Sequence, residues 1–440
     1  MARNSAPVFT MAGAGLAGSL LAVILARKGY QVEVFESRAD MRKVDISAGR
    51  SINLALANRG IRPLEALGLM DKVTPLLIPM QGRMVHVDGQ PSQLQPYGQQ
   101  AHEVIYSVSR GELNSLLMTE AEQTGRVNIH FEQRITGVDL SSKSLALEHR
   151  GRTIARSFDR MIGADGANSI VRDAIMSATD SASSIDVLDH SYKELHIAPN
   201  SDNSHKLAKN ALHIWPRGEF MMIALPNLDG SYTVTLFMPT RGEISFESLT
   251  QTDDILPFFK QYFAAVMPML ENLESSFQAN PTGRLATVKC SPWHYQDSAL
   301  IIGDAAHAIV PFHGQGMNCA FEDCQAIANL FPAATQAEHT DWAELFRLVD
   351  KQRKPNSDAI ADMALENYIE MRDSVMRPEY LLRKQFAFQL QRWFPERFTP
   401  RYGMVMFDDR SYEEAYALGK VHLQLLTELA DEVGSVERLT

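Results

Sequence analysis

The feature that most constrains the fold is a glycine motif near the start of the chain, GAGLAG, with glycines at Gly13, Gly15 and Gly18. The apolar stretch PVFTMA precedes the motif, the apolar stretch LAGSLLAVILA runs on from it, and the alternating stretch YQVEVFES follows. This pattern is typical of a strand, a glycine turn, a buried helix and a second strand. It predicts a βαβ unit, in which the two strands run parallel in one sheet.

Each glycine of the motif has a separate task in such a unit. Gly13 makes the tight turn, Gly15 leaves room for the backbone to approach a diphosphate, and Gly18 lets the helix pack on the strand. The helix N-terminus adds unpaired N–H groups and the positive end of its dipole. Glu36 follows at the end of the next strand, where a carboxylate accepts hydrogen bonds from ribose hydroxyls. The pattern predicts a Rossmann-type dinucleotide site without separating NAD from FAD.

Two later apolar runs end in a glycine with an aspartate close behind it. One is FDRMIGADGANSIVR, which carries Asp165, and the other is IIGDAAHAIVPFHGQGMN, which carries Asp304. A Gly-Asp pair taken alone also occurs in plain β-turns. Found in this order after a Rossmann turn, the two pairs favour an extended cofactor that the protein touches along its length, and therefore FAD.

The glycine loop after Asp304 predicts where the flavin ring lies. Asp304 is placed to accept hydrogen bonds from ribityl hydroxyls, and the backbone of loop 314–316 can reach an isoalloxazine edge. A helix that begins near Met317 and Asn318 would aim its positive end at the flavin pyrimidine, where charge accumulates on reduction. His313 and Gln315 could relay protons, but a loop histidine is more often only polar, so neither is assigned a catalytic role.

Composition excludes several other classes of protein. The chain has 440 residues, with 42 basic and 53 acidic side chains, and its net charge of -11 argues against nucleic-acid binding. Its 3 cysteines show no zinc-ligand spacing and are typical of a reducing compartment, so we expect a cytoplasmic protein without a metal site. The stretch VFTMAGAGLAGSLLAVILA could mimic a signal peptide or a membrane span, but the strand pattern after it favours the βαβ unit.

Changes of pattern along the chain predict a mixed α/β fold: a Rossmann-type FAD-binding domain interleaved with an antiparallel-sheet substrate domain, plus a helical C-terminal region. Residues 211–239 alternate across two turn signals and predict a β-meander. The FAD-binding domain is assigned to 1–79, 101–180 and 285–330, the sheet domain to 80–100 and 181–284, and the helical region to 331–440.

The three motifs GAGLAG, GADGANSIVR and GDAAHAIVPFHGQGMN resemble, in this order, those of the single-component FAD-dependent aromatic hydroxylases. Further strings, among them GRSINLALANRG, GRMVHVDG, LQPYG, ALENYIEM and PRYGMVMF, are similar to those of family members that hydroxylate L-kynurenine. The eukaryotic members carry a hydrophobic C-terminal membrane segment that this sequence lacks, so the resemblance implies a soluble, bacterial form. The oligomeric state stays open, a homodimer included.

That resemblance implies an enzyme that uses FAD, NADPH and O2 to convert L-kynurenine to 3-hydroxykynurenine through a flavin C4a-hydroperoxide. Because the flavin carries the chemistry, no catalytic side chain and no metal is implied. The implied cofactor contacts are Gly13, Gly15, Gly18, Glu36, Arg38, Ala55, Arg110, Ile135, Asp165, Asp304, Gly316, Met317 and Asn318. The implied substrate contacts are Arg83, Tyr97, Asn367 and Tyr402.

The chemistry of the four implied substrate contacts agrees with such a role, although each has an ordinary alternative. Arg83 could hold a carboxylate through two charge-assisted hydrogen bonds, or be a surface residue. Tyr97 and Tyr402 could donate to a ligand, or be core tyrosines. Asn367 shares a helix face with apolar residues by its spacing, so its amide needs either a ligand or a structural partner.

Three rival functions remain open at this point. An FAD enzyme of another kind, such as a flavin reductase or a hydroxylase of another aromatic acid, would keep every cofactor motif. An NAD-dependent dehydrogenase would use only GAGLAG and leave Asp165 and Asp304 unexplained. A flavoprotein that only binds partners would be yellow but inactive. No second glycine fingerprint is present for NADPH, so we expect it to dock transiently.

Overall fold

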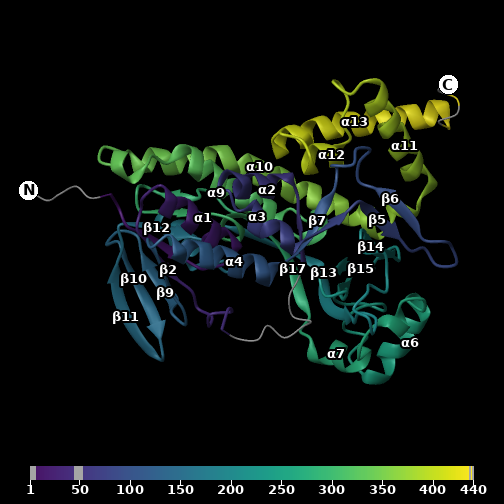
Figure 1. Cartoon of the computed structure of the whole chain (residues 1–440), viewed down its shortest axis with the longest axis horizontal. Coiled ribbons are helices and arrows are strands. Elements are labelled where there is room, and N and C mark those ends of the chain that lie inside the picture. The colour runs from purple at the N-terminus through teal and green to yellow at the C-terminus, as the bar shows by residue number, and fades with distance from the viewer. Residues whose placement is uncertain (1–5, 44–52, 436–437, 439–440) are drawn as a thin grey trace, which may run out of the picture.

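The computed structural model describes residues 6–43, 53–435 and 438. The first four residues of the string GRSINLALANRG, 49–52, lie outside this range, as do residues 1–5 before the first strand. Figure 1 shows two main sheets side by side, with the long helix α10 (Trp342–Arg372) running across one side of the molecule.

The first main sheet is the predicted nucleotide-binding sheet. Its strand order is β18 (His294–Tyr295), β19 (Ala299–Ile301), β12 (Arg160–Gly163), β1 (Phe9–Ala12), β2 (Val32–Phe35), β8 (Val127–His130). All neighbours are parallel except β18 and β19. Parallel neighbours bring the carboxyl ends of β1, β12 and β19 to one edge, where α/β folds bind their ligands.

The predicted βαβ unit is confirmed: β1 and β2 are joined by α1 (Leu16–Arg27). Leu20 and Leu21 have no exposed surface, and α1 packs against α4 (Arg110–Gln123) and α9 (Gly316–Leu330). A helix that is apolar almost all round is therefore a core helix here. Within the described ranges, no helix combines the length and the hydropathy needed to cross a bilayer.

The second main sheet has seven strands in the order β17 (Gly283–Lys289), β13 (Ser184–Ile197), β16 (Tyr232–Pro239), β15 (Met221–Pro226), β14 (Leu212–Pro216), β5 (Gly82–Val85), β6 (Gln93–Pro96). Strands β14 to β16 form the predicted antiparallel meander. Only the pair β14 and β5 is parallel. Strands β5 and β6 pair antiparallel with each other and come from an earlier, distant part of the chain.

The two faces of this sheet have different partners. Residues such as Met222, Val234 and Leu236 point into a core closed by the helices α6 (Thr252–Tyr262) and α7 (Leu273–Ala279). The alternating residues, among them Ile223 and Phe237, face the first sheet instead. The period of two along each strand thus separates a packed face from a face that lines a cavity.

The chain after Asp323 is helical, as predicted. Beyond α10 it forms α11 (Pro378–Trp393), α12 (Arg401–Met406) and α13 (Tyr412–Val433), which gather beside β5 and β6 in Figure 1. Three more helices lie along the chain, α2 (Asn58–Ala66), α3 (Met70–Val73) and α5 (Ile170–Ala178). The four-residue helix α8 (Asp304–His307) directly follows Gly303.

Two small three-stranded sheets complete the described chain. One contains β3 (Asn53–Leu56), β7 (Ile105–Ser109) and β4 (Leu77–Met80), and it joins the two main sheets. The other contains β11 (Arg152–Ser157), β10 (Ser144–His149) and β9 (Arg134–Asp139). Strand β11 carries no apolar alternation, and all six of its residues are exposed, so the sequence pattern did not indicate it.

Candidate functional site

The three cofactor motifs meet at one edge of the first sheet. Ala12 pairs with Gly163, and Gly163 pairs with Ile301, so the turns after β1, β12 and β19 are neighbours. The approach is close enough that a Cβ added at Gly13 would lie 2.6 Å from the carbonyl oxygen of Ala164. Parallel register therefore assembles one site from three segments that are far apart in the sequence.

One cavity of about 520 Å³ extends from these turns to the second sheet and the C-terminal helices. The predicted cofactor contacts that line it are Gly15, Ala55, Arg110, Asp304, Gly316 and Met317. The predicted substrate contacts that line it are Arg83, Tyr97, Asn367 and Tyr402. The remaining predicted cofactor contacts, Gly13, Gly18, Glu36, Arg38, Ile135, Asp165 and Asn318, do not line it.

The end of the cavity at α1 suits a dinucleotide. A Cβ added at Gly15 would meet nothing within 4 Å, whereas one added at Gly18 would lie 2.2 Å from the Gly13 carbonyl oxygen. Gly18 is therefore needed for packing, and Gly15 leaves open space at the N-terminus of α1, where a diphosphate is stabilised. Asp304 opens α8 with its carboxylate exposed in the cavity wall. These residues fit an FAD molecule that lies along the cavity.

Glu36 lies behind the glycine turn rather than in the cavity wall. Its carboxylate accepts hydrogen bonds from the Ala14 N–H at 2.9 Å and from the backbone and side chain of Arg38, both at 2.9 Å. Burial alone would raise the pKa of Glu36, but Arg38 more than offsets this and lowers it. The ionised carboxylate is thereby fixed next to the first glycine of the turn.

Asp165 caps a helix instead of facing the cavity. Its carboxylate accepts hydrogen bonds from the Ser169 hydroxyl at 2.6 Å and from the Ile170 N–H at 2.8 Å, at the start of α5. Burial raises the pKa of Asp165, and these hydrogen bonds counteract the rise. Its neighbours Ala164 and Gly166 line the cavity, so Asp165 holds the turn that forms the wall.

Asn318 is also a residue that holds the cavity wall in place. Its amide donates to the carbonyl oxygens of Ala55 and Gly314, both at 2.9 Å, and accepts from the Ala57 N–H at 2.9 Å. The side chain has no exposed surface. It ties β3 to the glycine loop 314–316, whereas the neighbouring Met317 lines the cavity.

We predict that Asn318→Ala destabilises the protein. The change leaves the buried Ala57 N–H unpaired, which costs about 1–3 kcal/mol of unfolding free energy. Thermal unfolding of the cofactor-free protein measures the effect as a lower midpoint. Asn329→Ala is the matched control, because Asn329 is exposed on the same helix and accepts a hydrogen bond from the Gln325 side chain. Equal thermal midpoints for the two variants would contradict the proposal that Asn318 links β3 to loop 314–316.

The substrate end of the cavity is organised around Arg83. Only 4% of Arg83 is exposed, so the alternative of a surface residue is wrong. Its guanidinium donates to Glu370 Oε1 at 2.7 Å and to Asn367 Oδ1 at 3.1 Å, and it lies 5.1 Å from the Tyr402 ring centre. Burial would lower the pKa of Arg83, but Glu370 more than offsets it. The buried Nε has no hydrogen-bond partner among the described residues.

Three rings are stacked beside Arg83. Tyr97 and Tyr402 lie 5.0 Å apart with an interplanar angle of 10°, and His313 also stacks on Tyr402, with ring centres 5.6 Å apart. Burial raises the pKa of Tyr97 to about 12, so its phenol stays protonated and can donate. Burial, together with the charges of Arg401 and Arg83, lowers the pKa of His313 to about 3. His313 is therefore a neutral wall of the cavity.

The buried amide of Asn367 has structural partners. Its face of α10, with Ile360, Ala364 and Met371, is buried as the spacing predicted. The amide donates to the Phe312 carbonyl oxygen at 2.6 Å and accepts from Arg83, yet the residue also lines the cavity. Asn367 thus fixes Arg83 and the start of the glycine loop.

Glu370 is a candidate site residue that no sequence motif indicated. It neutralises Arg83 and also accepts a hydrogen bond from the Tyr380 hydroxyl at 2.9 Å. Burial would raise the pKa of Glu370, but Arg83 lowers it. The available signal was its position three residues after Asn367, which places both on neighbouring surface of one helix.

One buried group of side chains has the atoms of a metal site. A ring nitrogen of His307, Cys319 Sγ and an Asp323 oxygen lie within 4.8 Å of one another. However, Asp323 already accepts from His307 at 2.6 Å, from Arg353 at 2.8 Å and from the Gly303 N–H at 3.0 Å. A carboxylate whose oxygens are committed to three donors, one of them cationic, serves the fold rather than a cation.

Comparison with known proteins agrees with the assignment of this cavity to FAD. A family model described as FAD binding domain matches residues 5–355. A kynurenine 3-monooxygenase of Stenotrophomonas maltophilia (strain K279a) is 45% identical over 418 residues, which cover 94% of this chain and 90% of that protein. A kynurenine 3-monooxygenase of Myxococcus xanthus (strain DK1622) is 43% identical over 97% of this chain and 92% of that protein.

Solved structures share the fold at low sequence identity. The tetrameric form of 2-methyl-3-hydroxypyridine-5-carboxylic acid oxygenase matches with a TM-score of 0.67 and 19% identity, covering 86% of this chain and 95% of that chain. The tetracycline destructase Tet(51) matches with a TM-score of 0.62 and 17% identity, covering 90% and 99%. The near full-length similarity at over 40% identity is what decides membership: the chain belongs to the kynurenine 3-monooxygenase family of FAD-dependent aromatic monooxygenases.

Proposed function

We propose that this enzyme hydroxylates L-kynurenine to 3-hydroxykynurenine with NADPH and O2. The observation that carries the proposal is a buried arginine, Arg83, at the end of a cavity that begins at the dinucleotide turn. A cation at one end and apolar walls along the rest suit an amino acid with an aromatic ring. The names of its relatives, kynurenine 3-monooxygenases, support this substrate.

The cavity residues divide the binding of FAD among them. Gly15 would give the diphosphate access to the N-terminus of α1, Asp304 would accept hydrogen bonds from the ribityl chain, and Gly316 and Met317 would offer backbone N–H groups of α9 to the flavin ring. When bound, FAD would supply the redox chemistry, in which the hydride of NADPH and one proton are used, one oxygen atom of O2 enters the substrate ring and the other leaves as water.

The substrate is held by its charged end. Its carboxylate approaches the unpaired Nε of Arg83 and the Tyr97 hydroxyl, which stays protonated because burial raises the pKa of Tyr97 to about 12. Its ring then lies against the apolar wall that the second sheet supplies through Met221, Ile223 and Phe237. This orientation points the ring toward loop 314–316, where the flavin is expected.

The residues around the substrate exclude water rather than move protons. Phe312, His313 and Tyr402 close the cavity from the side of the C-terminal helices. With a pKa of about 3, His313 takes up no proton near neutral pH. A dry site matters because water would divert activated oxygen into hydrogen peroxide instead of product. NADPH docks transiently, since the chain has no second glycine fingerprint.

Anaerobic reduction followed by oxygen tests the proposal. The purified yellow protein is mixed with NADPH without oxygen, with and without L-kynurenine, and the flavin absorbance is followed. Then ¹⁸O2 is admitted and the product mass is measured. We expect faster reduction with L-kynurenine and one labelled oxygen atom in the product.

Flavin reduction by NADPH, measured with a panel of other aromatic acids, distinguishes L-kynurenine hydroxylation from the rival activities. A hydroxylase of another acid would show its largest stimulation with that acid, and a flavin reductase would be insensitive to all of them. If L-kynurenine neither accelerates reduction nor gains oxygen, the proposed activity is wrong.

A further inference from the structure

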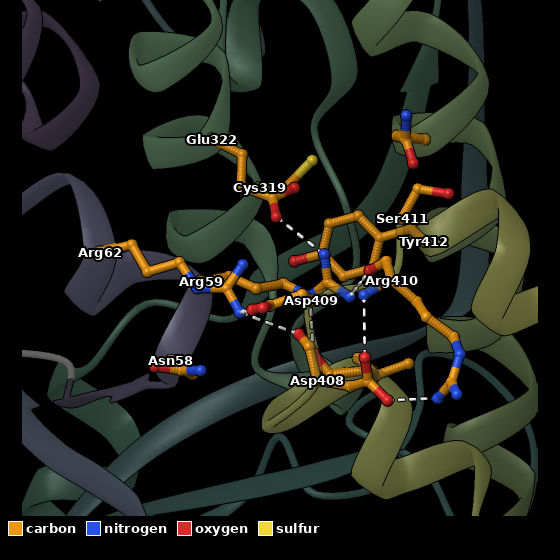
Figure 2. Close-up of polar contacts among 12 residues, drawn as sticks. Asn58, Arg59, Arg62, Cys319, Glu322, Asp408, Asp409, Arg410, Ser411 and Tyr412 are labelled. Carbon is orange, nitrogen blue, oxygen red and sulfur yellow. Dashed lines mark hydrogen bonds and ion pairs between the residues drawn. The ribbon is translucent and has the colours of Figure 1, made fainter. Parts of the chain in front are cut away.

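We propose that Arg59 is a positioning residue that fixes the substrate helix α12 against the cofactor wall. The inference rests on the proposed function, because its effect is on how productively substrate is held. Arg59 lies on α2, which begins directly after the cavity strand β3, and only 2% of it is exposed. Figure 2 shows it between Glu322 of α9 and the segment that joins α12 to α13.

The guanidinium of Arg59 holds the C-terminal end of α12. Its Nε donates to the Val405 carbonyl oxygen at 2.7 Å, and Nη2 donates to those of Met404 at 3.1 Å and of Arg410. The last carbonyl groups of a helix lack partners within it, and a cation there is also favoured by the helix dipole. The same short helix carries Tyr402, which stacks on Tyr97 in the cavity.

A chain of alternating charges connects Arg59 to the cofactor turn. Arg59 Nη1 donates to Glu322 at 2.8 Å, Glu322 pairs with Arg353 at 3.1 Å, and Arg353 pairs with Asp323 at 2.8 Å. Asp323 accepts from the N–H of Gly303, the residue before Asp304. Glu322 and Arg353 each have an oppositely charged partner on both sides, and Arg59 has Glu322 on one side and carbonyl oxygens on the other. The buried charges are thus compensated. The chain thus links α12 to the proposed ribityl contact.

A second branch connects the same region to the glycine loop. The Tyr412 ring lies 4.0 Å from the Arg59 guanidinium, and its hydroxyl donates to Gln315 Oε1 at 2.6 Å. The Gln315 amide in turn contacts Met406 Sδ at 3.0 Å. Burial and the nearby Glu322 raise the pKa of Tyr412, so the phenol keeps the proton it donates. Gln315 sits between Gly314 and Gly316, which line the cavity.

These contacts allow Arg59 to position two walls of the cavity, in addition to stabilising its own surroundings. The cavity has one wall from α9 and the Gly303 turn, which face the cofactor, and another from α12, which faces the substrate. Arg59 bonds to both, so it sets the distance between the two walls. Displacing a reacting group by about 1 Å can reduce the rate about a hundredfold. We therefore expect a defect in coupling rather than in cofactor binding.

The test compares Arg59→Lys with Arg62→Lys in the FAD-loaded protein. A lysine at position 59 keeps the positive charge, but its three N–H donors cannot serve Glu322 and the three carbonyl groups at once. Arg62 lies on the same helix and contacts Asp408 and Asp409 from outside, so it is the matched control visible in Figure 2. Calorimetry measures the dissociation constant for L-kynurenine, and a peroxidase assay measures hydrogen peroxide per NADPH.

For Arg59→Lys we expect substrate binding to weaken about tenfold and the peroxide fraction to rise, with the FAD content of the wild type. Arg62→Lys should match the wild type in both. Tyr412→Phe, which removes one hydroxyl and keeps the ring, should raise the peroxide fraction too. Wild-type values for Arg59→Lys at full FAD content, or for Tyr412→Phe should Arg59→Lys fail to fold, would overturn the inference. A wild-type enzyme that ignores L-kynurenine would instead refute the proposed function.

Discussion

Gly15→Ala is expected to yield a stably folded protein that has lost most of its affinity for FAD. The added methyl group meets no protein atom within 4 Å, and the backbone of Gly15, with φ −72° and ψ −178°, suits any residue. The methyl group occupies the space through which a diphosphate would approach α1. Overpacking of this kind costs about 1–3 kcal/mol, which is roughly a 5- to 150-fold loss of affinity.

Titration of the cofactor-free protein with FAD, followed by flavin fluorescence, measures this loss, and Gly15→Val should enlarge it. Gly13→Ala is the contrasting control. Its methyl group would lie 2.6 Å from a backbone oxygen of Ala164, at a φ of +92°, so we expect that variant to lose stability itself. If Gly15→Ala binds FAD like the wild type, the diphosphate does not lie at this turn.

Arg83→Ala is expected to abolish tight binding of L-kynurenine while FAD stays bound. Truncating one partner of a buried, hydrogen-bonded charge pair costs about 2–5 kcal/mol, which is roughly 30-fold to several thousandfold in affinity. Glu370, whose pKa Arg83 lowers in the wild type, is left buried without its partner in this variant, so the protein is also destabilised. Calorimetric titration with L-kynurenine measures the loss.

The double variant Arg83→Ala/Glu370→Gln separates binding from stability. Replacing the carboxylate by an amide removes the unpaired charge, so the thermal midpoint should recover toward the wild-type value. Affinity for L-kynurenine should not recover, because the cation that the substrate carboxylate needs is still missing. Recovery of both would mean that Arg83 only balances Glu370 and does not contact the substrate.

Local sequence patterns were enough to predict the elements that carry the site. The βαβ unit, the helix that begins at Gly316 and the meander of β14 to β16 depend on periodicity and turn residues within short windows, and all were confirmed. Such patterns are local because a helix or turn forms most of its hydrogen bonds within a few residues. The four implied substrate contacts came from a family resemblance instead, and all four residues line one cavity.

Tertiary structure decided which predicted residues face the cavity and which hold its walls. Asp165 and Asn318 belong to the right motifs, yet their side chains cap a helix and tie a loop to a strand. Arg83 meets Glu370 across 287 positions of sequence, and Arg59 meets Val405 across 346. A charged side chain in a buried position needs a partner, but its sequence neighbours do not show which distant segment supplies that partner.

The residue order alone fixed the succession of the cofactor turns and the buried face of elements with a clear apolar period, such as α10 and the strands β14 to β16, because both follow from local spacing. Only the folded chain decided that the three turns stand side by side, through the parallel register of β1, β12 and β19, and that α12 closes the far end of the cavity. Those arrangements depend on long-range pairing and on the burial of paired charges, which no short window of residues encodes.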